Sequence, residues 1–138
     1  MTQNMLEIAE ITEEFQLFDD WEDKYAYLIE LGKKLPPLPE PLKTEESKVH
    51  GCTSQVWLVK YQEEGDADRV YFKADSDAFI VKGLIALLLR IYSGKTKQQI
   101  LQVDIEQCFK ALEFGQYLSP SRSNGFFAMV ERIRTLAQ

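Results

Sequence analysis

The sequence predicts an α+β fold of one domain over residues 1–138, with helices packed on a small antiparallel sheet of about three strands. Apolar residues recur at helical spacing in the first third of the chain and again after residue 78. Between these regions, segments 55–61 and 69–74 are rich in β-branched and aromatic residues and are separated by a turn. A chain of 138 residues buries a substantial core without disulfides.

Two amphipathic helices are expected at the N-terminus. The first has apolar residues at helical spacing, with acids between them: Met5, Ile8, Ile11, Phe15 and Phe18. Asp19 or Asp20 is expected to cap the second, whose apolar face runs from Trp21 to Leu35. Residues 35–41 contain four prolines, which stop this helix and predict an extended connector.

The simplest arrangement of the two β-rich segments is an antiparallel hairpin, with the turn at residues 63–68. Val49 is expected to begin an earlier edge strand, which would place Cys52 on the loop between two strands. A loop held by a sheet on both sides can present a side chain without unfolding its surroundings.

Residues 75–77, Asp-Ser-Asp, precede an apolar segment at 78–92 that predicts a buried helix. Two acids separated by one residue could bind a metal ion, but no further ligand set accompanies them, and helix capping is the preferred interpretation. Gly83 lies inside this helix, where glycine indicates close packing against another element. Lys82 either lies near the cysteine loop or extends to solvent.

Three more helices are expected toward the C-terminus. Thr96 can cap a short one at 97–101, and a second covers 105–113. Ser119 followed by Pro120 is a strong start for the final helix. Cys108 lies in the second of these helices beside apolar residues, and we interpret it as structural.

The net charge of −6 argues against nucleic acid as the main partner, because phosphate binding requires a basic surface. The segment 78–92 is too short and too charged to cross a membrane, which takes about 20 apolar residues. Glu7 and Glu10 interrupt any N-terminal apolar run, so no secretory signal is expected, and the predicted location is the cytoplasm. A homodimer is left open.

The candidate functional segment is residues 49–57, in which Cys52 directly follows Gly51. Gly51 permits a sharp bend, and the positive form of His50 would favour the thiolate of Cys52, which is the reactive state of cysteine. The alternative is that Cys52 is a small core residue, as most cytosolic cysteines are.

The sequence lacks the residues that other catalytic or binding sites would require. His50 is the only histidine, and neighbours on an extended strand point to opposite faces, so it is poorly placed as a general base for Cys52. Cys52, Cys108 and His50 show no zinc-ligand spacing. Phosphate-binding and dinucleotide-binding motifs are absent from the sequence. No cofactor and no metal site are therefore expected.

The chain resembles the SufE family, the sulfur-accepting partners of cysteine desulfurases in iron–sulfur cluster assembly. The resemblance is sharpest at residues 51–57, and further motifs follow the family order at 21–25, 29–32, 35–36, 75–78, 80–84, 118–123 and 125. Ala74 departs from the glycine that the family often has before Asp-Ser-Asp. The resemblance implies a fold similar to that of the iron–sulfur scaffold proteins.

The resemblance implies that Cys52 accepts a persulfide sulfur from a pyridoxal-phosphate-dependent cysteine desulfurase and relays it to an iron–sulfur scaffold. It also implies a loop that buries Cys52 against apolar side chains at rest and extends into the partner. Trp57 and the helix from Ala78 would wall that cavity. Asp77 and Arg122, together with His50 and Gly51, would restrain the loop or contact the partner.

Two functions therefore remain open. The first is a sulfur relay that stimulates its desulfurase and carries a covalent persulfide on Cys52, without being a stand-alone enzyme. The second is a non-covalent adaptor that activates a desulfurase while Cys52 is structural. A CsdE-type acceptor, which shares the chemistry but serves a different desulfurase, is a close variant of the first; Ser54 and Gln55 after the cysteine favour the SufE type.

Overall fold

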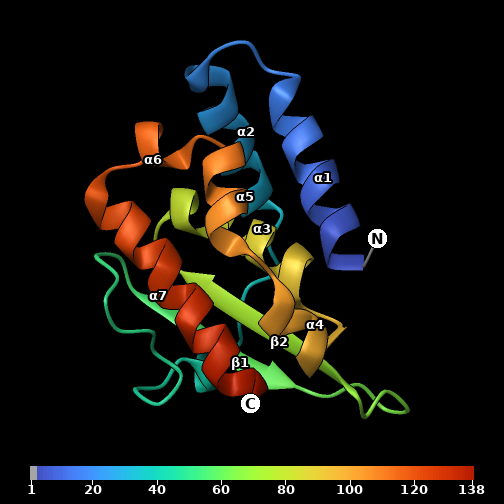
Figure 1. Cartoon of the computed structure of the whole chain (residues 1–138). Helices are drawn as coiled ribbons and strands as arrows, with labels where there is room; N and C mark the ends of the chain where they lie inside the picture. The colour runs from blue at the N-terminus through green and yellow to red at the C-terminus, as the bar shows by residue number, and fades with distance from the viewer. Residues whose placement is uncertain (1–2) are drawn as a thin grey trace.

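The structure is a computed structural model that describes residues 3–138, and the side chains from Glu7 onward. It confirms the α+β class, with helices packed on an antiparallel sheet (Figure 1). The helices are α1 (Gln3–Gln16), α2 (Trp21–Lys33), α3 (Phe79–Tyr92), α4 (Lys97–Gln102), α5 (Ile105–Ala111), α6 (Phe114–Tyr117) and α7 (Pro120–Ala137). The strands are β1 (Val56–Tyr61), β2 (Arg69–Ser76) and β3 (Lys95–Thr96), and a 3-10 turn, η1, covers Glu40–Leu42.

Side-chain caps predicted from the sequence mark the starts of three helices. Asp20 caps α2, Ser119 caps α7, and Thr96 caps α4 in a capping box with Gln99. The first helix is shorter than predicted, because α1 ends at Gln16 and Phe18 lies in the connection that follows. The side chain of Met5 lies outside the described part of the chain.

The sheet has the order β1-β2-β3, and β1 and β2 form the predicted antiparallel hairpin. The prediction of an edge strand at Val49 is wrong. The chain there makes a single bridge, between Lys48 and Trp57, because Ser47 donates its backbone N–H to the Thr44 hydroxyl and turns away from β1. The third strand is instead β3, which pairs with the start of β2.

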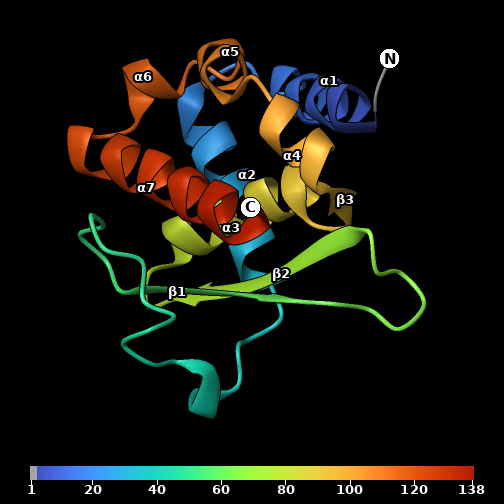
Figure 2. The same ribbon diagram turned by 60° about the horizontal axis from the view of Figure 1, so that its bottom comes forward.

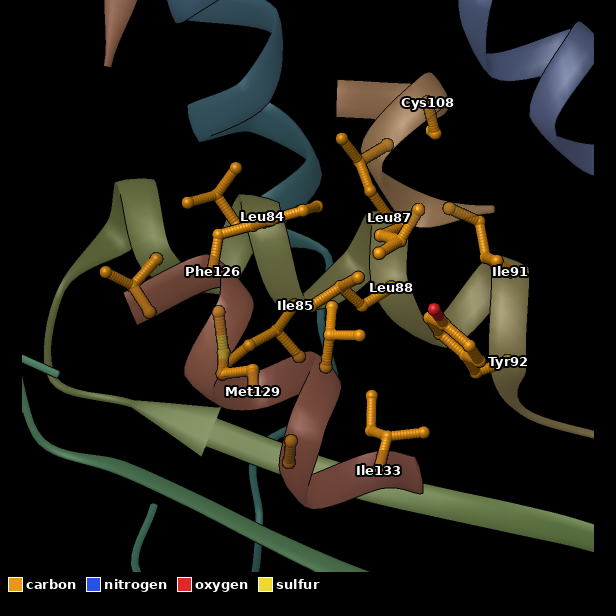
Figure 3. Close-up of a cluster of buried hydrophobic side chains, with 14 of the residues drawn as sticks. Leu84, Ile85, Leu87, Leu88, Ile91, Tyr92, Cys108, Phe126, Met129 and Ile133 are labelled. Carbon is orange, nitrogen blue, oxygen red and sulfur yellow. The ribbon is translucent and has the colours of Figure 1, made fainter. Parts of the chain in front are cut away.

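The sheet separates two layers (Figure 2). Alternate side chains of β1 and β2 face the helices and are buried, namely Val56, Leu58, Phe72 and Ala74. Residues 35–48, here called the strap, cross the opposite face. Figure 3 shows the core between α3 and α7, where Leu84, Phe126 and Met129 lie close together.

The strap is fastened to the sheet by Asp75. The backbone N–H of Leu38 donates to Asp75 Oδ2 at 3.0 Å, and Lys43 and Lys82 lie 3.5 and 3.6 Å from the same carboxylate. Lys82 thus binds Asp75, which neither sequence interpretation of this lysine anticipated. The predicted cap at residues 75–77 is also wrong, since Asp75 and Ser76 belong to β2, and α3 begins after Ala78 without a side-chain cap.

No helix in the described part of the chain combines the length and the hydrophobicity that crossing a membrane requires.

Helices α2 and α3 approach each other through glycine, as the sequence predicts for Gly83. A Cβ on Gly83 would lie 2.1 Å from the carbonyl oxygen of Leu28, and one on Gly32 would lie 2.4 Å from the carbonyl oxygen of Phe79. Both contacts are with backbone, which cannot rotate away. The two helices can therefore pack at this distance only while both positions lack a side chain.

Replacing Gly83 with alanine is expected to destabilise the protein by about 2–3 kcal/mol, because overpacking outweighs the gain of about 1 kcal/mol in helix propensity. Chemical denaturation measures this difference. Gly65→Ala is the control: its Cβ would meet nothing within 4 Å, so only the left-handed backbone at φ +82° opposes it, at about 1–2 kcal/mol. A Gly83→Ala protein as stable as the wild type would contradict the close approach.

Candidate functional site

Cys52 follows a sharp turn whose geometry depends on Gly51. Gly51 has a φ of +93°, in the left-handed region that residues with a Cβ adopt only at a cost. A Cβ there would also lie 3.4 Å from the Cβ of Ala128 on α7. The turn thus brings the cysteine against α7.

The Cys52 side chain is half-buried at a glycine of α7. Its thiol donates to the carbonyl oxygen of Gly125 with an Sγ–O separation of 3.7 Å. A Cβ on Gly125 would lie 3.5 Å from Sγ, in ordinary van der Waals contact, so nothing larger than alanine fits there beside the sulfur. Gly125 contributes to the site by having no side chain and by offering its carbonyl oxygen.

Behind the thiol lies a small pocket between α3 and α7. Its apolar wall consists of Val81, Leu84, Phe126 and Met129, three of which Figure 3 shows between the two helices. The space inside, about 10 Å³, admits about one water-sized sphere. The pocket is therefore almost filled when Cys52 occupies its mouth.

Burial raises the pKa of the Cys52 thiol above its ordinary value, because the charged thiolate is less well solvated there. No neighbouring charge contributes to this shift. His50, which the sequence suggested as a cation that favours the thiolate, is exposed and forms no hydrogen bond to Cys52. In this conformation Cys52 is held as a thiol and not as the reactive thiolate.

Side chains from two other elements hold the residues that follow Cys52. Arg122, on α7, donates from Nη1 to the Ser54 hydroxyl at 3.0 Å. The carboxylate of Asp77 accepts from the backbone N–H of Gln55 at 3.0 Å, and the Asp77 N–H donates to the Gln55 carbonyl oxygen at 3.3 Å. Arg122 and Asp77 thus hydrogen-bond to the chain two and three residues after Cys52, and their role as loop restraints stays a prediction.

Trp57 does not line the pocket, contrary to the cavity-wall prediction. Val56 faces the helices and is buried, so Trp57, as the next residue of β1, faces the strap. Its ring lies under Lys43, whose Nζ is 5.2 Å from the ring centroid. The predicted second wall, the helix after Ala78, does contribute Val81 and Leu84.

Sequence reasoning missed Gly125 as a neighbour of the thiol. The available signal was a glycine inside an apolar helical pattern, which often marks a close approach of another backbone. It could not indicate which segment approaches. Cys108 is fully buried, and burial raises the pKa of its thiol to about 11, which agrees with its interpretation as structural. Within the described residues, no group of three or more His, Cys, Asp or Glu side chains could hold a metal ion.

Comparisons with known proteins place the chain in a family. The model of the SufE family, described as an Fe-S metabolism associated domain, matches residues 9–137. An uncharacterized SufE-like protein of Rhizobium meliloti (strain 1021) is 43% identical over 136 residues, covering 97% of this chain and 96% of the relative. One of Rhizobium etli is 46% identical over 136 residues, covering 97% and 91%.

The fold also resembles a solved structure. The solution structure of a hypothetical protein from Thermus thermophilus has a TM-score of 0.75, with 22% sequence identity, and the match covers 95% of this chain and 93% of that one. At this identity the likeness concerns the fold.

Substituting leucine at Gly125 is expected to displace Cys52 from the pocket mouth, since the larger side chain occupies the same space. The rate of alkylation of Cys52 at neutral pH should rise by about threefold or more, and the midpoint of its pH profile should fall, because leaving the buried position lowers the pKa of the thiol. Peptide mapping after brief treatment with iodoacetamide measures both.

Gly125→Ala is the matched control, since a Cβ fits there in ordinary contact and should leave the pH profile close to that of the wild type. If the leucine variant remains folded by circular dichroism and keeps the wild-type rate and midpoint, Gly125 does not determine the position of the thiol.

Proposed function

The chain belongs to the SufE family, and we propose that it is a sulfur-acceptor and relay protein of iron–sulfur cluster assembly, with Cys52 as the carrier. Its donor would be a pyridoxal-phosphate-dependent cysteine desulfurase, which it also stimulates, and its acceptor an iron–sulfur scaffold in the same cytoplasm. The family is associated with Fe-S metabolism. The proposal adds the two transfer steps, from the desulfurase to Cys52 and from Cys52 to the scaffold.

The transfer proposed for Cys52 is a thiol–persulfide exchange. The Cys52 thiol loses its proton, and the thiolate attacks the outer sulfur of the persulfide on the desulfurase cysteine. A new S–S bond forms at Cys52, the S–S bond of the donor breaks, and the donor cysteine leaves as a thiolate that takes up a proton. The outer sulfur moves from the donor cysteine to Cys52 without any net oxidation, so no further reactant is required.

The observation that carries the proposal is that Cys52 lies outside the core, in a segment that hydrogen bonds hold in place. Cys52 is half-buried at a pocket mouth, whereas Cys108 is 1% exposed inside the core. Three hydrogen bonds, one to Ser54 and two to Gln55, fasten the chain just after Cys52. Breaking them would release the thiol without disturbing the sheet, which is what a carrier that visits two proteins requires.

The raised pKa of Cys52 is the observation that favours the alternative, a non-covalent adaptor. A buried thiol is a poor nucleophile, and an adaptor would not need one. A relay reconciles this burial with reactivity only if the loop opens on the partner. The two functions differ in whether sulfur becomes bound to this chain.

The decisive experiment is intact-mass spectrometry after incubation with a cysteine desulfurase and cysteine. A relay gains the mass of about one or more sulfur atoms, lost again on reduction, and Cys52→Ser gains none. Cys108→Ala is the matched control and should gain the same mass as the wild type, because its thiol is buried.

Desulfurase turnover, recorded in the same samples, separates the two functions. Stimulation that survives in Cys52→Ser, with no added mass on the wild type, would establish the adaptor and end the relay proposal.

A further inference from the structure

A second surface of the molecule, separate from the cysteine pocket, has the features of a peptide-binding groove. It lies beside β1, between the strap and the C-terminal half of α7, and its apolar lining includes Leu42, Leu58, Val59 and Leu136. Figure 2 shows the strap and α7 on opposite sides of the strand layer. Leu42 is 40% exposed and thus offers apolar surface at the rim of the groove.

The strand that borders this groove has a free edge. β1 is the edge strand of the sheet. The end of the strap and the residue after it pair with β1 only briefly, through Leu58 N–H to Ser47 O and Val49 N–H to Val56 O. Because backbone groups alternate along a strand, those of Lys60 point to the same side as those of Leu58. Among the described residues, neither the carbonyl of Leu58 nor the N–H of Lys60 is hydrogen-bonded to the strap, which has already turned away.

Two cations flank this edge without forming ion pairs among the described residues. Lys60 Nζ donates to the carbonyl oxygen of Leu136 at 2.9 Å, and Arg132 Nη2 donates to the carbonyl oxygen of Glu46 at 2.7 Å. Both acceptors are neutral. The exposed carboxylate of Glu46 also borders the groove, which leaves two positive charges against one negative in a chain of net charge −6.

Arg132 has an unmet hydrogen-bond donor as well. Its Nε–H is buried and has no hydrogen-bond partner among the residues that the structure describes. A buried donor without a partner is costly, and such groups in native structures call for an explanation. A carboxylate entering the groove could accept from Nε and a terminal nitrogen together, in the two-bond geometry that arginine favours, after a small shift of the side chain.

We propose that this groove binds an extended segment of a partner protein that adds to the free edge of β1 and carries alternating apolar and acidic side chains. The Leu58 carbonyl and the Lys60 N–H would continue the ladder begun by the strap. Because side chains alternate along a strand, the apolar side chains would lie on the strap side, on Leu42 and Val59. The carboxylates would lie on the α7 side, where they would meet Lys60 and Arg132. The inference rests on the edge, the groove and the charges, and it is independent of the chemistry of Cys52.

The groove also bears on the cysteine loop. The strap meets β1 at Ser47, the chain stays paired with β1 as far as Val49, and Cys52 follows after only His50 and Gly51. A segment bound at this edge would therefore lie next to the part of the chain that leads into the turn at Gly51.

The test is a titration of the isotope-labelled protein, followed by NMR, with a capped hexapeptide of sequence threonine-valine-glutamate-valine-glutamate-threonine. Backbone shifts should map to residues 58–60 and to the C-terminal half of α7, and the Lys60 amide should exchange more slowly with peptide bound. The same peptide with lysine in place of glutamate should bind at least about threefold more weakly. Raising the salt concentration should weaken the binding of the acidic peptide, because salt screens its attraction to the two cations.

Lys60→Gln and Arg132→Gln should each weaken binding of the acidic peptide by about twofold to fivefold. Lys73→Gln is the matched control: Lys73 is an exposed lysine of β2 whose Nζ lies over the ring of Tyr61, and it does not line the groove. This variant removes the same charge and should bind the peptide as the wild type does.

Four results would overturn the proposal. No shifts at about 5 mM peptide would mean that the groove is not a peptide site. Equal binding of both peptides would show that the groove does not select acidic segments. Chemical-shift changes without slower exchange of the Lys60 amide would show that the peptide does not add to β1 as a strand. Self-association that Lys60→Gln abolishes, seen by sedimentation, would assign the edge to a second copy of this chain and also refute the stated occupant.

Discussion

The arrangement of the strap, the sheet and α3 depends on the buried carboxylate of Asp75. Its side chain is about 4% exposed and accepts from the backbone N–H groups of Leu38 and Ser76. Burial alone would raise the pKa of Asp75, but these two hydrogen bonds and the charges of Lys82 and Lys43 outweigh it and hold the pKa below its ordinary value. A buried carboxylate without partners costs several kcal/mol, so the three elements that supply partners must meet at this point. Asp75 thereby fixes where the strap crosses the sheet.

The sequence predicted the parts of the fold that depend on neighbours in the chain. The caps at Asp20, Thr96 and Ser119 bond to backbone only three residues away, so a short motif contains both donor and acceptor. The Asp-Ser-Asp motif was misinterpreted as a cap, because it resembles one locally while its acids act at a distance. Asp75 binds Leu38, and the Asp77 carboxylate binds Gln55, 22 residues earlier in the chain. Pairing over such separations depends on the tertiary fold, which no local motif encodes.

The same limit applies to the site. The bend at Gly51 and the candidate thiol of Cys52 could be identified because glycine and cysteine are adjacent. The contact with Gly125 spans 73 positions and arises only when α7 packs beside the turn. Trp57 was placed in the cavity wall on the family resemblance, and the sequence could not correct this. The imperfect alternation of β1 does not reveal which face meets the helices, and a shift of one residue reverses every side chain.

On the proposed function, the burial of Cys52 and its reactivity would belong to two positions of one loop, a resting one and an open one. At rest the thiol is protonated, hydrogen-bonded to Gly125 and set against an almost filled apolar pocket, which disfavours premature attack and oxidation. Opening would exchange the hydrogen bonds of Ser54 and Gln55 for contacts with a partner or with water. Because the bond at Gln55 is exposed and the bond at Ser54 is only part-buried, this exchange would cost about 1 kcal/mol for each bond. A partner that binds the open form better can supply this free energy from its own contacts. On the proposed function, the thiolate would then form where the donor persulfide is, and in few other places.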